Sequence, residues 1–142
     1  MKKIYIFYIL SILVCIISFR SIYFLGSKIM IIQYLLLSVL PIILTMLLNG
    51  IYVYSTQDNN IIRNSIIFSI IYTFFMVLSI IIFNSLGVFN IISNNSKGLY
   101  TDGFSIGSEI VFNVTDAVLP AVLCFLLAYI SGTIMKRVRQ AK

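Results

Sequence analysis

The stretch that decides the fold is residues 29–54, which read IMIIQYLLLSVLPIILTMLLNGIYVY. No charged residue occurs between Lys28 and Asp58. A bilayer core about 30 Å thick is crossed by about 20 apolar residues in a helix, so this run is long enough to cross it. The run is apolar on every face rather than along one stripe, unlike a helix on the surface of a soluble protein. It therefore predicts a transmembrane helix.

Three further apolar runs accompany this one. They predict spans over residues 4–25, 64–89 and 113–135. A polar turn at residues 55–60 separates the second span from the third. Residues 90–108 are rich in Asn, Ser and Gly, which is typical of a loop. We therefore expect an all-α integral membrane protein, with one domain that folds as a four-helix transmembrane bundle.

The composition indicates the same class. Of the 142 residues, 61% are hydrophobic and only 10% are charged, and the mean hydropathy is +1.08. Soluble domains have about 45–50% apolar and about 25% charged residues. So few charged side chains are too few to cover a water-facing surface, and membrane lipid is the expected surrounding.

The orientation follows from the excess of Lys and Arg on cytoplasmic loops. With four spans, both termini lie on one side of the membrane. That side carries Lys2, Lys3, Arg63, Lys136, Arg137, Arg139 and Lys142. The other side carries Arg20, Lys28 and Lys97. We therefore expect both termini to be cytoplasmic (N-in/C-in) and the loop over residues 90–108 to face outward.

The net charge of +6 raises the question of a nucleic-acid partner. The basic residues lie at the ends of the predicted helices rather than on one face, which is typical of contact with lipid headgroups. We therefore expect no nucleic-acid partner. The Ile- and Asn-rich composition with a Lys-terminated tail is typical of bacteria, so the expected location is the bacterial cytoplasmic membrane.

Few residues in the chain are suited to catalysis or metal binding. The chain has no His, the commonest general base. Cys15 and Cys124 each lie within an apolar run and have no Cys or His neighbours that could complete a zinc site. We therefore expect no catalytic residue, no metal, no cofactor and no enzymatic activity.

The acidic residues are Asp58, Asp102, Glu109 and Asp116. Asp116 is a candidate intramembrane polar residue, because the last helix could begin before it and draw it into the bilayer. Arg20, near the outer end of the first span, is its candidate partner. The alternative is that Glu109 and Asp116 are solvated near a helix start, where the helix dipole favours negative charge.

Small residues in the last span fall three or four apart and so share one helix face. They are Ala117, Ala121, Cys124, Ala128 and Gly132. Small residues let helices approach closely in a membrane, where the hydrophobic effect does not drive association. The pattern predicts a helix-packing face, used either within the bundle or between copies of the chain.

Residues near the predicted span ends mark the edge of the hydrocarbon. Asn49 and Asn84 are interpreted in this way, with hydrogen bonding across helices as the alternative. Tyrosines serve as anchors at headgroup level. They are Tyr5, Tyr8, Tyr23, Tyr52 and Tyr54.

Four features of the chain appear in one order: an Ile/Leu-rich first span, Val39-Leu40-Pro41-Ile42-Ile43 in the second, a polar loop before the last span, and a Lys136-Arg137-x-Arg139 tail. In this layout the chain resembles the Msa family, staphylococcal membrane proteins that modulate the regulator SarA. The resemblance implies a non-enzymatic membrane protein that influences virulence-gene expression as a signal transducer. It implies no catalytic residue.

Two functions are consistent with these features. The first is a small multi-pass membrane protein that acts as an accessory, regulatory or signal-transducing component through protein partners. The second is a small transporter or channel-forming subunit that self-associates through the last helix. The depth of Asp116 separates them, because small ion-coupled transporters place an acidic residue within a span.

Overall fold

The computed structural model describes residues 2–56, 60–96 and 112–141, and within these ranges the regular structure is entirely helical. The elements are α1 (Lys2–Leu25), α2 (Ile31–Thr56), α3 (Ile61–Ser85), α4 (Val88–Ser96), the 3-10 helix η2 (Val114–Ala117) and α5 (Val118–Gln140). The predicted all-helical class is confirmed for the described residues. The predictions about Asp58, Asp102 and Glu109 fall outside them.

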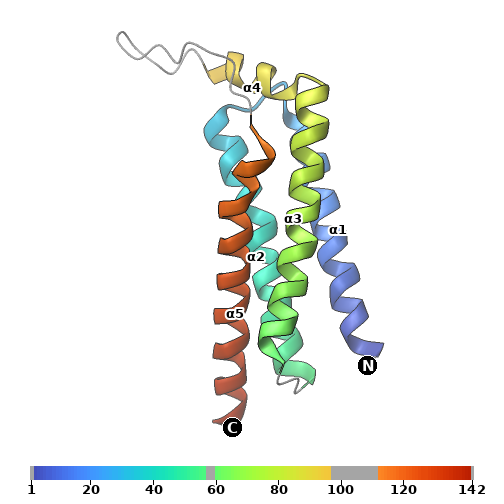
Figure 1. Cartoon of the computed structure of the whole chain (residues 1–142), viewed down its shortest axis with the longest axis vertical. Helices are drawn as coiled ribbons and strands as arrows, with labels where there is room; N and C mark the ends of the chain where they lie inside the picture. The colour runs from blue at the N-terminus through green and yellow to red at the C-terminus, as the bar shows by residue number, and fades with distance from the viewer. Residues whose placement is uncertain (1, 57–59, 97–111, 142) are drawn as a thin grey trace, which may run out of the picture.

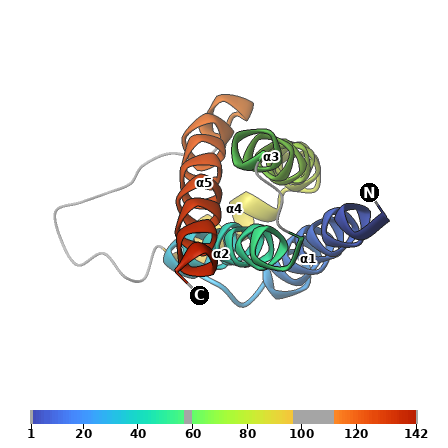
Figure 2. The same cartoon turned by 90° about the horizontal axis from the view of Figure 1, so that it is seen from below.

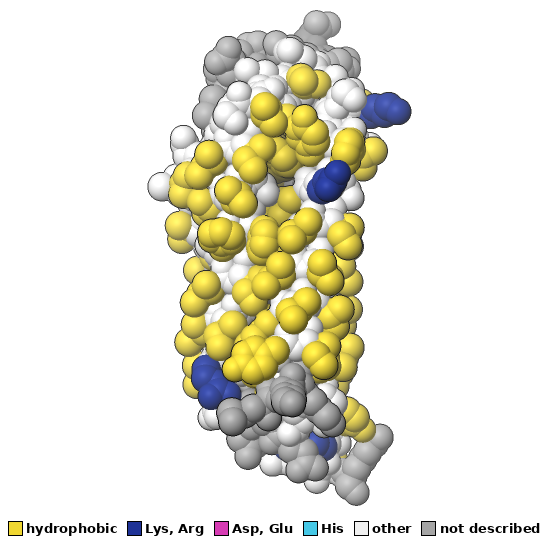
Figure 3. All heavy atoms as spheres, turned by 90° about the vertical axis from the view of Figure 1, so that its right-hand side faces the viewer, with side chains coloured by type: hydrophobic (Ala, Val, Ile, Leu, Met, Phe, Trp, Pro, Cys, Tyr) yellow, Lys and Arg dark blue, Asp and Glu magenta, His cyan; other side chains and the backbone are white. Residues whose placement is uncertain are grey.

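Four helices are long and apolar enough to cross a membrane: α1, α2, α3, and η2 continued by α5. Exposed large hydrophobic side chains occur along all of them, for example Ile17, Leu36, Ile70 and Leu119. Figure 3 shows one side of the molecule covered with hydrophobic side chains, with Lys and Arg only toward its two ends. These are the features of a multi-pass membrane protein.

The long helices run alternately up and down, so that both chain termini lie at one end of the molecule (Figure 1). We call this the tail end, and the opposite end, where α4 and η2 lie, the cap end. α5 packs against α2 and α3, and α1 packs against the same two helices. α1 and α5 lie on opposite sides of the bundle (Figure 2). α2 and α3 thus form its middle, although they touch each other less than either touches α5.

The third span and the loop after it differ from the sequence prediction. α3 covers Ile61–Ser85 rather than residues 64–89, and α4 occupies the beginning of the region predicted to be a loop over residues 90–108. The break is at Gly87, whose φ of 66° is in the left-handed region. Glycine adopts that region without the cost of a Cβ, so it stops α3 and redirects the chain.

The last helix is also longer than predicted. The predicted span ended at residue 135, before the basic tail, whereas α5 continues to Gln140 and includes Arg137 and Arg139 in its last turn. Lys and Arg are good helix formers, and positive charge is favoured at a helix C-terminus. The basic tail is therefore part of the helix.

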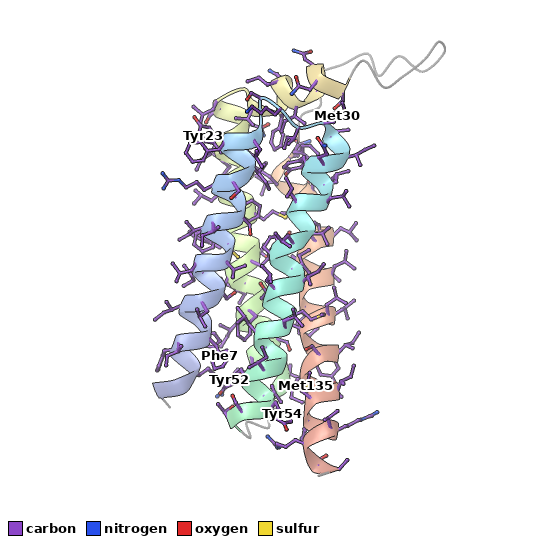
Figure 4. The ribbon with its side chains drawn as sticks, turned by 180° about the vertical axis from the view of Figure 1, so that it is seen from behind. Phe7, Tyr23, Met30, Tyr52, Tyr54 and Met135 are labelled. Atoms are coloured by element: carbon purple, nitrogen blue, oxygen red, sulfur yellow. The ribbon has the colours of Figure 1, made fainter. Side chains whose placement is uncertain are left out.

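Aromatic side chains lie near both ends of the bundle (Figure 4). Tyr23 lies toward the cap end, whereas Tyr52 and Tyr54 lie toward the tail end. Phe7 of α1 points toward Tyr52 of α2, with 5.5 Å between the ring centroids in an edge-on arrangement. Such pairs contribute about 0.5–1.5 kcal/mol beyond the area they bury, and this one joins α1 to α2 at the tail end.

Candidate functional site

A buried asparagine joins three helices. The side chain of Asn49 on α2 is fully buried. Its Nδ2 donates a hydrogen bond of 2.7 Å to the carbonyl of Ala128 on α5 and one of 3.3 Å to Oγ of Ser65 on α3. Among the described residues, the Oδ1 atom of Asn49 has no hydrogen-bond partner. The alternative interpretation of Asn49, bonding across helices, is therefore the one that the structure shows.

Two glycines let α2 and α5 approach closely at this level. A Cβ on Gly132 of α5 would lie 2.8 Å from Cγ2 of Ile61 and 3.2 Å from Nδ2 of Asn49. A Cβ on Gly50 of α2 would collide with Oγ of Ser131. Real Cβ contacts are longer than 3.0 Å, so neither position accepts even alanine without a shift. The absence of a side chain is what allows this packing.

The small-residue face of the last helix faces α2 and α3. Four of its five members are buried: Ala117, Cys124, Ala128 and Gly132. Ala121 is half-buried, and its carbonyl accepts a 2.9 Å hydrogen bond from Oγ of Ser69 on α3. The face is thus occupied within the monomer, so self-association would have to use another surface.

The cap end is closed by α4, which crosses the ends of the long helices (Figure 1). Its buried residues repeat at helical spacing: Val88, Phe89, Ile92, Ser93 and Ser96. Nδ2 of Asn95 donates to the carbonyl of Ile29 at 3.1 Å, and Oγ of Ser96 accepts from the backbone N–H of Ile31 at 2.8 Å. These bonds fasten α4 to the turn between α1 and α2.

An aromatic cluster lies beneath α4. The rings of Phe89 and Phe112 have centroids 4.8 Å apart, and Tyr34 of α2 lies 5.3 Å from the first and 5.2 Å from the second. Phe83 of α3 completes the cluster, 5.7 Å from Phe89. Asn84 of α3 donates to the carbonyl of Phe112 at 2.7 Å, which fixes where the chain enters η2. The aromatic cluster and these hydrogen bonds hold the cap in a defined position on the bundle.

Asp116 and Arg20 make different interactions, and the structure does not bring them together. Asp116 is exposed, and its Oδ2 accepts a 2.8 Å hydrogen bond from the backbone N–H of Asn113 in a capping box at the start of η2. Arg20 is exposed on α1, with its guanidinium 5.5 Å from the ring centroid of Phe24. α3 stands between α1 and α5, so the pairing predicted from the sequence does not form.

Two grooves on the sides of the bundle are lined in part by basic side chains. One, of about 310 Å³, lies between α1 and α3 toward the cap end, and Arg20 is its charged residue. The other, of about 610 Å³, lies between α3 and α5 at the tail end and contains Arg63 and Lys136. Both have mostly aliphatic or aromatic walls.

Within the described ranges, no group of three His, Cys, Asp or Glu side chains is close enough to hold a metal ion. Cys15 and Cys124 are free and buried. The described side chains that are open to contact with a ligand include the exposed ones of the cap and those of the two grooves.

The sequence interpretation missed two parts of this arrangement. It preferred Asn84 as a marker of the hydrocarbon edge, with hydrogen bonding across helices as the alternative, and it did not foresee the bond from Asn84 to the carbonyl of Phe112. It also missed α4, although the spacing of Val88, Phe89 and Ile92 is helical and Gly87 just before them is a helix stop signal.

The chain was compared with protein families, with curated proteins and with solved structures. No match was found in any of the three comparisons.

Proposed function

We propose that this chain is a non-enzymatic, multi-pass membrane protein that acts as an accessory, regulatory or signal-transducing component through protein partners, which bind at its cap end. The observation that carries the proposal is the cap itself. α4 is held by hydrogen bonds to the α1–α2 turn and packs on an aromatic cluster. It still exposes Asn90, Ile91 and Asn94. A fixed backbone with exposed polar and apolar side chains suits recognition, because little ordering is needed on binding.

The proposed orientation is N-in/C-in in a bacterial cytoplasmic membrane. The tail end carries most of the Lys and Arg residues of the sequence, including Arg137 and Arg139 in the last turn of α5. This excess is typical of the cytoplasmic side. The cap would then face outward, where it is available to a partner or a signal.

Two observations favour this proposal over the transporter or channel subunit. Ion-coupled transporters place an acidic side chain deep within a span, whereas Asp116 lies at the cap-end start of its candidate span, where it closes a capping box with Asn113. Self-association through the last helix needs its small-residue face, which packs against α2 and α3. The resemblance to the Msa family also favours a regulatory membrane protein.

The test is photo-crosslinking in membranes from the cap. A benzophenone amino acid replaces Ile91 of α4, which is 44% exposed, and the matched control places it at Ile70 of α3, which is 61% exposed. We expect a discrete protein adduct from position 91 and only lipid adducts from position 70. The proposal is wrong if position 91 yields no protein adduct, or if both positions yield the same one.

A further inference from the structure

The groove between α3 and α5 at the tail end has a graded lining. The polar groups come from Asn60 and Arg63 at the start of α3 and from Lys136 near the end of α5. The apolar wall comes from Ile62, Ile66, Ile67 and Tyr129, together with Ile61. Because α3 leads away from the tail end and α5 leads toward it, the cations lie near the end of the bundle.

The apolar wall extends from there toward the middle of the bundle. Tyr129 precedes Lys136 by about two helical turns, or about 10 Å along the helix. Ile66 and Ile67 lie about one turn beyond Arg63 on α3. The lining thus changes from charged to apolar along the direction in which a membrane changes from headgroup to hydrocarbon.

The charge around the groove favours an anion. Lys136 is half-buried in the groove, and Arg63 is exposed beside it. Arg139 does not line the groove, and its NH1 donates a 3.0 Å hydrogen bond to the carbonyl of Val53 on α2. Asp58, the acidic residue nearest in sequence, lies outside the described residues.

From this placement we propose that the groove between α3 and α5 binds an anionic phospholipid, with the phosphate between Arg63 and Lys136 and an acyl chain along Ile66 and Tyr129. Basic pockets between membrane helices on the cytoplasmic side bind acidic headgroups in this manner. The volume of about 610 Å³ accommodates a headgroup and the first part of a chain. The inference rests on the proposed N-in/C-in membrane placement, but it does not depend on a partner at the cap.

The sequence makes a direct test possible, because the chain contains no Trp. An Ile66→Trp variant places a single reporter in the groove, and Ile70→Trp places one on the same helix face one turn further along, outside the groove. The purified full chain is reconstituted into phosphatidylcholine vesicles that contain phosphatidylglycerol. Either the phosphatidylglycerol or the phosphatidylcholine carries brominated chains, which quench Trp fluorescence on contact.

We expect brominated phosphatidylglycerol to quench the reporter at position 66 more strongly than brominated phosphatidylcholine does at the same mole fraction. At position 70 the two lipids should quench equally. Replacing one cation, Arg63→Gln or Lys136→Gln, should lower the preference about fivefold, from the usual contribution of a basic residue near anionic lipid. The matched control is Arg137→Gln, an exposed cation in the last turn that does not line the groove, and it should retain the preference.

Three results would overturn the inference. Equal quenching by the two lipids at position 66 means that the groove does not select charge. An equal effect of Arg137→Gln and Lys136→Gln means that the preference is a diffuse property of the tail end. Quenching at position 70 but not at position 66 means that protein covers the groove, either a second copy or another chain. If neither reporter is quenched, the membrane placement itself fails, which is a separate outcome from the loss of lipid preference.

Discussion

The side-chain amide of Asn49 donates a 2.7 Å hydrogen bond to the carbonyl of Ala128 and so joins α2 to the small-residue face of α5. The same amide reaches Ser65 of α3. One side chain therefore connects the three helices that are packed together at the tail-end half of the bundle. The first two predictions below concern this connection, and the other three concern the cap end and the orientation.

Replacing Asn49 with alanine should lower the free energy of unfolding by about 1–2 kcal/mol, because interhelical hydrogen bonds in membranes contribute up to about this amount. Thermal unfolding of the detergent-purified protein measures the loss. Asn90→Ala is the matched control, since Asn90 is exposed on α4, and it should leave the unfolding temperature unchanged. Equal unfolding temperatures for Asn49→Ala and the wild type would contradict the prediction.

Gly132→Ala should destabilise the bundle by about 1–3 kcal/mol, because the new methyl group would lie too close to Cγ2 of Ile61. Ile61→Ala removes the obstructing atoms, at a cost of its own. In a double-mutant cycle, the two changes together should cost less than the sum of the single changes. Strict additivity would show that the two side chains do not meet.

Gly87→Ala should destabilise the turn between α3 and α4 by about 1–2 kcal/mol through its backbone, because its φ of 66° is in the left-handed region. Steric contact adds nothing, since among the described residues no heavy atom beyond its chain neighbours lies within 4 Å of the new Cβ. Gly87→Asn should cost less, since Asn tolerates a positive φ better than Ala does. The two unfolding temperatures provide the comparison. If the two variants lose the same stability, the turn is not limited by φ.

Asp116→Ala should cost about 0.5–2 kcal/mol through loss of the capping box with Asn113. Arg20→Ala should act independently, because Arg20 contacts Phe24 on α1 instead. The double variant should therefore lose the sum of the two single losses, measured by thermal unfolding. A coupling energy above about 0.5 kcal/mol between the two changes would contradict this prediction and support the ion pair predicted from the sequence.

The orientation is testable by cysteine labelling. In a background with Cys15 and Cys124 replaced by alanine, an impermeant maleimide applied to intact cells should label Asn90→Cys on α4. It should label Gln140→Cys only after the membrane is permeabilised. Both positions are exposed in the structure, so accessibility of the folded chain is equal. The opposite labelling pattern would reverse the proposed topology.

The sequence predicted the long helices because their signal is a property of each run alone. A long run without a charge, such as residues 29–54, has few possible structures in a soluble protein, so a transmembrane helix is the clear prediction. Helix ends were less accurate, for example at Ser85, because the approximate end was inferred from hydropathy, which continues through Leu86 and Val88. α3 ends because Gly87 adopts a positive φ, not because the sequence becomes polar there.

The side-chain contacts could not be predicted from the sequence, because they depend on which helices become neighbours. Asn49 could equally have ended a span or bridged two, and only the position of Ala128 on α5 decides between them. The small-residue face was recognised by spacing, but its partners, α2 and α3, were not. The pairing of Asp116 with Arg20 failed because α3 lies between their helices, which no local pattern encodes.

α5 touches α2 and α3 more than these touch each other, and it follows α1, α2 and α3 in the described chain. Before α5 is made, α2 and α3 are held together mainly by α1, and the amide of Asn49 has no carbonyl from Ala128 to meet. The full packing of the bundle therefore requires that α5 has been made. A nascent chain that stalls before α5 would leave three helices without the contacts and the buried hydrogen bond that α5 supplies.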